Sequence, residues 1–210
     1  MRGWFRLSYE GLEHIPASGP AIVACNHLSY LDPLTNASAV MKAGRRPRFL
    51  AKDELFRIPV VGWAFEGAKQ IRVVRGSGDA TTALRAAERA IADGEVVVIY
   101  PEGTVTTRPD HLPMRGKTGV VRLSLATGVP ITPLASWGSQ AVWQKSGKGS
   151  LRFGRPVWTR VGAPIDLEGR SGSTADAEEI RAMTAELIAT LTAMVEELRA
   201  TYPRRWTDGG

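Results

Sequence analysis

The chain has 210 residues, of which 43% are hydrophobic and 23% charged; this balance excludes a disordered or fibrous protein and fits one folded domain. Its 27 lysine and arginine residues exceed its 21 acidic residues, and the formal charge of +6 favours an anionic partner: nucleic acid, a phosphorylated small molecule or an acidic membrane surface. The single cysteine, Cys25, excludes an internal disulfide, and no cysteine–histidine cluster has zinc spacing.

Apolar residues occur only in short runs. None reaches the roughly 18 residues that a membrane-spanning helix needs, and residues 1–16 contain no apolar run of signal-peptide length. We therefore expect any membrane contact to be peripheral and the reducing cytoplasm to be the default compartment. No repeat or linker divides residues 1–210, which predicts a single domain.

Strand-like and helix-like segments alternate along the chain. Five runs rich in β-branched residues predict strands at residues 21–25, 48–51, 71–74, 96–100 and 131–134. Between Asp79 and Asp93, apolar residues share one helical face and Gly94 supplies a stop, which predicts a helix. This alternation indicates an α/β fold with a largely parallel central sheet flanked by helices. In such folds ligands bind beyond the carboxyl ends of the strands.

The last third of the chain has a different pattern. Residues 151–153 and 157–161 predict short strands at a sheet edge. From about residue 174 to 200 the apolar residues have helical spacing, after an acidic first turn and a near capping box, Ser173-x-x-Asp176. The apolar stripe of this amphipathic helix is expected to pack on the sheet; a membrane face and a dimer seam are the alternatives.

A polar turn, Asn26 to Pro33, directly follows the first of these strands. Asp32 before Pro33 predicts a helix start, with Asp32 as cap and Pro33 at the first helical position. The turn allows the side chains of His27 and Asp32 to converge, and a carboxylate on one imidazole nitrogen makes the other nitrogen a general base. Helix capping and solvent exposure are the alternative explanations of Asp32 and His27.

Two more strand ends carry polar residues. Glu102, Gly103 and Thr104 follow the strand at 96–100, where the glycine permits a positive φ or a close backbone approach. Arg75 ends the strand at 71–74, where its guanidinium could bind a phosphate with two hydrogen bonds. A simple turn and a surface arginine are the alternatives.

Taken together, these strings resemble the glycerolipid acyltransferase family, which contains the 1-acylglycerol-3-phosphate O-acyltransferases. The resemblance covers about residues 10–135. Its four blocks occur in the family's order, and a segment like the family's LAKxEL string lies between the first two. The matching strings are Asn26–Pro33, with its His-x4-Asp core; Leu50–Phe56; Ile71, Val73 and Arg75; Tyr100–Thr104; and Val129–Pro133. Val105 stands where the family usually has arginine, and Lys69 replaces a common glycine.

The resemblance implies transfer of a fatty acyl group from acyl-CoA or acyl carrier protein to a hydroxyl of lysophosphatidate, giving phosphatidate. His27 would be the general base and Asp32 would orient it. Arg75 would bind the acceptor phosphate, with Lys52 adding charge nearby. Glu102, Gly103 and Thr104 would position the glycerol. No metal or organic cofactor is implied, because the acyl thioester is a substrate.

The family's lipid substrates imply a peripheral position on the cytoplasmic face of the cell membrane. Apolar and cationic residues that suit such an interface, or else pack in the core, are Trp4, Phe5, Phe56, Ile58, Val60, Val61, Trp63 and Phe65, near Arg2, Arg6 and Arg57. Nucleic acid is not expected, since the basic cluster Arg45–Arg48 lacks interleaved aromatic residues. The rival functions are acylation of another lysolipid, glycolipid or amino-acid lipid, which Val105 raises, and lipid binding without catalysis.

Overall fold

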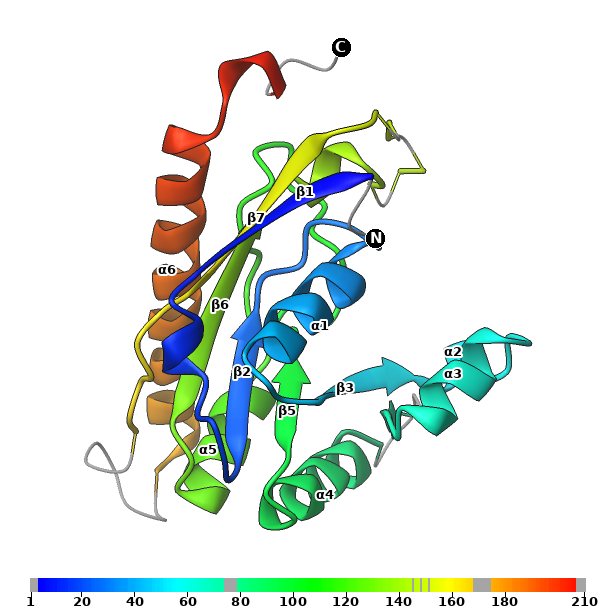
Figure 1. Cartoon of the computed structure of the whole chain (residues 1–210). Coiled ribbons are helices and arrows are strands. Elements are labelled where there is room, and N and C mark those ends of the chain that lie inside the picture. The colour runs from blue at the N-terminus through cyan, green and yellow to red at the C-terminus, as the bar shows by residue number, and fades with distance from the viewer. Residues whose placement is uncertain are drawn as a thin grey trace.

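The computed structural model describes residues 4–73, 79–144, 146–147, 149–150, 152–167 and 175–206. Within them, seven strands form one sheet in the order β1-β7-β6-β2-β5-β3-β4 (Figure 1). The strands are β1 Phe5–Glu10, β2 Ala21–Cys25, β3 Pro47–Lys52, β4 Ile71–Val73, β5 Val96–Ile99, β6 Ile131–Trp137 and β7 Arg155–Val161.

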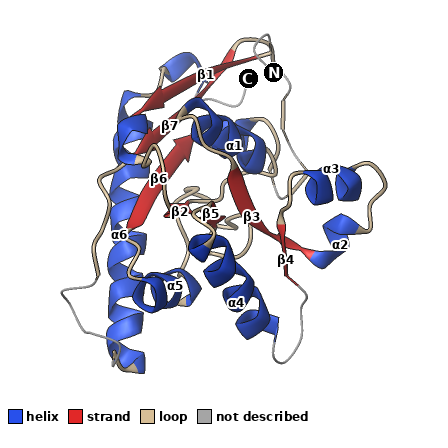
Figure 2. Cartoon of the chain, turned by 60° about the horizontal axis from the view of Figure 1, so that its bottom comes forward, coloured by secondary structure: helices blue, strands red, loops and turns tan. Residues whose placement is uncertain are grey.

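Helices occupy most of the connections between these strands. The α-helices are α1 Asp32–Lys42, α2 Asp53–Phe56, α3 Val61–Gly67, α4 Asp79–Ala92, α5 Gly119–Thr127 and α6 Ala177–Thr201. Short 3-10 helices are η1 Leu12–His14, η2 Ser139–Ala141 and η3 Arg204–Trp206. Helices α2 and α3 stand beside β3 and β4, away from the bulk of the other helices (Figure 2).

The centre of the sheet is parallel. Strand β2 pairs in parallel with β5 on one side and with β6 on the other, and β3 pairs in parallel with β5 and β4. Among the seven strands of the described residues, β6 and β7 form the one antiparallel pair, while β1 runs parallel to β7. The predicted α/β class with a largely parallel sheet is confirmed. The carboxyl ends of β2, β5 and β6 therefore meet at one end of the sheet.

The alternation of side chains along the central strands creates two cores. Ile22 and Ala24 of β2, with Val97 of β5, face the core shared with α4, α5 and α6. Val23 and Cys25, one residue out of step, face the second core, which includes α1. Burial on both faces explains why these strands have continuous rather than alternating apolar sequences.

Helix α6 packs on the sheet, as predicted. Ile180, Leu187, Leu191 and Val195 are buried and join the cores next to β6. Its start differs from the sequence prediction. The observed capping box joins Asp176 and Glu179, whose carboxylates each accept from the other's backbone amide. The predicted partner, Ser173, lies outside the described residues.

The predictions fail mainly at the β1 edge. Strand β1 was not predicted, because the strand assignments relied on continuous apolar runs, although its alternation of half-buried and exposed side chains is the pattern of a half-buried strand. Residue 152 is irregular and residues 153 and 154 form a turn in place of the predicted strand, while Leu151 lies outside the described residues. Strand β7 is real but lies inside the sheet, since β1 covers its outer side. A partner distant in sequence thus converts an expected edge strand into an internal one.

Candidate active site

The polar turn after β2 brings His27 and Asp32 together. The Nδ1 atom of His27 lies 2.9 Å from Oδ2 of Asp32, which confirms the predicted contact. Asp32 is completely buried, whereas His27 is partly accessible. The imidazole therefore stands between solvent and a buried carboxylate.

Asp32 has a different local role from the predicted helix cap. It is the first residue of α1, and Leu31 precedes the helix without a side-chain cap. Its Oδ2 atom instead accepts hydrogen bonds from the backbone amides of Leu28 and Ser29, which come before the helix. Its Oδ1 atom accepts from the Ser139 hydroxyl at 2.6 Å. With His27, four hydrogen-bond partners therefore hold the carboxylate in place.

The ring plane of His27 is fixed by Tyr100, which follows β5. The two rings stack with centroids 4.1 Å apart and an interplanar angle of 21°. The Tyr100 hydroxyl accepts a hydrogen bond from Asn36 of α1, and burial raises the pKa of this phenol well above its usual value. Tyr100 is therefore a neutral, anchored surface against which the imidazole packs.

Glu102 links the turn after β5 to the polar turn after β2, which contains His27, by hydrogen bonds. Its Oε1 atom accepts from the His27 backbone amide at 2.9 Å, and Oε2 accepts from the Met114 amide at 2.9 Å. Burial raises the pKa of Glu102, while the two amides act in the opposite direction. In this structure Glu102 thus holds the backbone of His27.

Gly103 needs the backbone freedom that the sequence suggested, since its φ is +68°. A Cβ atom on Gly103 would lie 2.9 Å from Nζ of Lys117, so this ammonium group lies directly beside the Gly103 backbone. Thr104 is half-buried in the same turn. Val105 is buried at 2% exposure, so the next position supplies core packing and no charge.

Two predicted binding residues are not placed by the structure. Arg75 lies outside the described residues. Lys52 is the last residue of β3, and its side chain is not among those described. Their roles remain predictions.

Other titratable groups near the site do not extend it. Cys25 is buried, and burial raises the pKa of its thiol well above the usual value, so it is a poor nucleophile. Among the described residues, no group of three or more histidine, cysteine, aspartate or glutamate side chains could hold a metal ion.

The sequence prediction missed Ser139 and Lys117. Ser139 lies two residues after β6, at the same end of the sheet as His27, so its place at a strand's carboxyl end was an available signal. Lys117 precedes α5, and its backbone amide donates to the Pro101 carbonyl. Nothing in the sequence indicates that contact, because a loop of irregular structure separates the two residues.

Several known acyltransferases are similar to this chain in sequence or in structure. The crystal structure of the 1-acyl-sn-glycerophosphate (LPA) acyltransferase PlsC from Thermotoga maritima matches with a TM-score of 0.72 and 29% identity, covering 95% of this chain and 74% of that one. The chloroplastic 1-acyl-sn-glycerol-3-phosphate acyltransferase LPAT1 of Arabidopsis thaliana is 28% identical over 187 residues, 87% of this chain and 49% of that protein. The lyso-ornithine lipid O-acyltransferase of Pseudomonas aeruginosa is 31% identical over 117 residues, 55% of this chain and 42% of that protein.

The chain spans less than half the length of these two curated relatives. Residues 6–137 match the model of the Acyltransferase family. This match covers more than half of the chain and includes the contact between His27 and Asp32 and the turn at Glu102. On this evidence the chain belongs to the acyltransferase family.

Proposed function

We propose that the chain transfers a fatty acyl group from acyl-CoA or acyl carrier protein to the free hydroxyl of lysophosphatidate, giving phosphatidate. The observation that carries this proposal is the partly accessible His27 imidazole, bonded at 2.9 Å to a buried carboxylate that three further donors hold. A hydroxyl is too weakly acidic to attack a thioester unaided, and this pair supplies the required base.

The hydrogen bond selects the tautomer of His27. An ionised carboxylate only accepts hydrogen bonds, so Nδ1 carries the proton and Nε2 keeps its lone pair. Nε2 takes the acceptor's hydroxyl proton as the oxygen attacks the thioester carbonyl. Asp32 then stabilises the imidazolium.

Collapse of the tetrahedral intermediate completes the transfer. The carbon–sulfur bond breaks, and the imidazolium returns its proton to the departing thiolate. The new ester stays on the acceptor, so no covalent acyl-enzyme is needed. Metal and organic cofactors have no part in this route.

The acceptor's phosphate is assigned to Arg75 and Lys117, with Lys52 adding charge, while Gly103 and Thr104 contact the glycerol. Glu102 positions His27 through its backbone amide and lies beside the glycerol site. Among the described residues, Lys117 forms no ion pair, and its Nζ lies beside the turn that begins with Glu102. An ammonium free of carboxylates suits a phosphate ligand.

Replacing Lys117 with alanine is expected to raise the acceptor KM about tenfold, because one charge-assisted hydrogen bond is lost. Arg75→Ala should act in the same direction, and neither change should alter the KM for the acyl donor. Steady-state kinetics with each substrate varied measures both effects. Arg122→Ala, an exposed arginine on α5, is the control. An unchanged acceptor KM would remove the corresponding residue from the phosphate site.

Ser139 is proposed to position Asp32 without touching substrate. Ser139→Ala should lower kcat about tenfold, because a hydrogen bond to a charged group is worth about 1.5–3 kcal/mol, while KM for both substrates stays unchanged. Ser124→Ala removes another buried hydroxyl, which lies on α5 and donates to the Val129 carbonyl. That control should affect stability alone. Equal kcat in the two variants would contradict the positioning role.

An acceptor panel tests the function itself. Free-thiol release from acyl-CoA is measured with lysophosphatidate, other lysophospholipids and lyso-ornithine lipid. The last acceptor is included because Val105 presents no charge and because the Pseudomonas relative is named for it. Highest kcat/KM with lysophosphatidate supports the proposal, and preference for lyso-ornithine lipid would replace it. No acceptor-dependent release would favour a lipid-binding protein without catalysis.

Lipid substrates require contact with a membrane, and we place the chain peripherally on its cytoplasmic face. No helix within the described part of the chain is long and apolar enough to cross a bilayer. Trp63 is 80% exposed and Val60 is 76% exposed, so the core explanation fails for these two side chains. Phe56 and Phe65 are half-buried and pack edge to face on each other. Tyr30 of the polar turn after β2 and its ring partner Trp143 are also exposed.

Trp63→Ala is therefore expected to weaken binding to lipid vesicles while leaving the free energy of unfolding within about 0.5 kcal/mol of wild type, as for exposed positions in general. Vesicle sedimentation and thermal unfolding provide the two readings. A large loss of stability with unchanged vesicle binding would contradict the interfacial role.

A further inference from the structure

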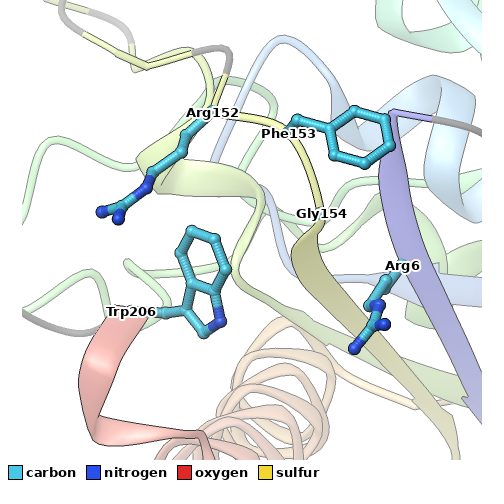
Figure 3. Close-up of a pocket in the computed structure, with 5 residues that line it drawn as sticks. All are labelled: Arg6, Arg152, Phe153, Gly154 and Trp206. Atoms are coloured by element: carbon cyan, nitrogen blue, oxygen red, sulfur yellow. The ribbon is translucent and has the colours of Figure 1, made fainter.

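A second cationic site lies apart from His27, at the β1 edge of the sheet. A cavity of about 430 Å³ is lined by Arg6, Arg152, Phe153, Gly154 and Trp206. Figure 3 shows the Trp206 indole in this cavity, with Arg6 and Arg152 to either side of it in that view. Its walls come from β1, the turn before β7 and η3, three segments far apart in the sequence.

The topology turns this cavity toward the same end of the sheet as the candidate active site. Strand β7 is antiparallel to β6, so its first residues lie beside the last residues of β6. Strand β1 is parallel to β7, which brings Arg6 to that end as well. Trp143, which follows η2 in the chain, contacts the polar turn after β2, because its carbonyl accepts from the Ser29 hydroxyl.

The cavity carries an excess of positive charge. Among the described residues, neither Arg6 nor Arg152 forms an ion pair, and no carboxylate lines the cavity. Arg155 is buried at 3% exposure under Trp206, 5.1 Å from the ring centroid, and its Nε atom has no hydrogen-bond partner. Arg152 lies 5.1 Å from the same ring centroid. A buried guanidinium that has no carboxylate partner among the described residues adds to the potential that attracts an anion.

Exposed aromatic side chains lie beside these cations. Phe153 is 70% exposed, and its ring contacts that of Trp4, which is half exposed, edge to face. Aromatic rings insert at the level of lipid headgroups, where arginine meets phosphate, whereas a soluble phosphate compound gives these exposed rings no apolar partner. The combination fits one ligand, a phospholipid within a bilayer.

We propose that this cavity binds the phosphate of an anionic phospholipid headgroup, between Arg6 and Arg152 and over Trp206, and so fixes the orientation of the chain on the membrane. The proposal rests on the proposed membrane location, but it does not depend on acyl transfer. A bound headgroup at this edge would turn the opening of the His27 site toward the bilayer that supplies the acceptor.

The test measures binding of the full chain to phosphatidylcholine vesicles with and without phosphatidylglycerol. The double variant Arg6→Ala and Arg152→Ala should weaken binding to the anionic vesicles about thirtyfold. The matched control removes two exposed arginines far from the cavity, Arg85→Ala on α4 and Arg181→Ala near the start of α6. It should change binding less than about threefold, since α4 and the start of α6 lie at the other end of the sheet from the cavity (Figure 1). Thermal unfolding verifies that both variants fold.

Equal losses in the two double variants would show that delocalised charge explains the binding and would overturn the site. Arg6→Lys with Arg152→Lys should bind with intermediate affinity, because lysine keeps the charge without the planar fork. Full binding by the lysine variant would also overturn the proposed headgroup site. The site would likewise be overturned if the Arg6→Ala and Arg152→Ala variant lost affinity for acyl carrier protein while its vesicle binding stayed unchanged, because the cavity would then bind an acidic protein. All vesicle-binding measurements can be repeated in a His27→Ala background. A lipid-binding site at the cavity is then tested independently of the proposed acyl transfer.

Discussion

His27→Ala is expected to lower kcat for acyl transfer by about 10²–10⁴-fold, the range for loss of a general base. The imidazole is partly exposed, and its removal leaves the Leu28 and Ser29 amides on Asp32, so the variant should fold. Turnover is measured by thiol release in the presence of the acceptor. His14→Ala provides the matched control, because the ring of this histidine, in η1, bonds to the Val161 carbonyl and not to Asp32. Retention of more than about a tenth of wild-type turnover would contradict the base assignment.

Asp32→Asn should lower kcat about 10²-fold or more, because it removes the charge that stabilises the imidazolium. The shape of the side chain is conserved. An amide oxygen at the position of Oδ2 can still accept from His27 and the two backbone amides, while the Ser139 hydroxyl turns to accept from the amide nitrogen. The variant therefore isolates charge from geometry.

A double-mutant cycle shows whether His27 and Asp32 work as a pair. The combined variant should be no slower than His27→Ala, because Asp32 acts only through the imidazole. Multiplied losses in the combined variant would mean that the carboxylate contributes to catalysis by another route.

The sequence was most informative where local pattern decides structure. Strands β2 and β5 were predictable because both of their faces are buried, and the composition of such strands is distinctive. The convergence of His27 and Asp32 was predictable because five residues and one turn separate them. The proximity of Glu102 to His27 was implied by the expectation that parallel strands end at one edge of the sheet.

What the sequence did not reveal depends on contacts between distant residues. The alternation of apolar and polar residues in β1 was an available strand signal, but its pairing with β7 was not visible in the sequence. The Ser139 bond to Asp32 crosses 107 positions of the chain. The local sequence of Asp32 matches that of a helix cap. Its carboxylate instead accepts hydrogen bonds from the backbone amides of Leu28 and Ser29, which precede the helix.

We propose that this chain forms phosphatidate with His27 as the general base. The most direct measurement follows label from radioactive acyl-CoA, and separately from acyl carrier protein, into phosphatidate after lysophosphatidate is added to purified protein on vesicles. We predict labelled phosphatidate with at least one donor, and its loss with His27→Ala. Absence of labelled product with both donors, or equal formation by the wild type and His27→Ala, would contradict the account.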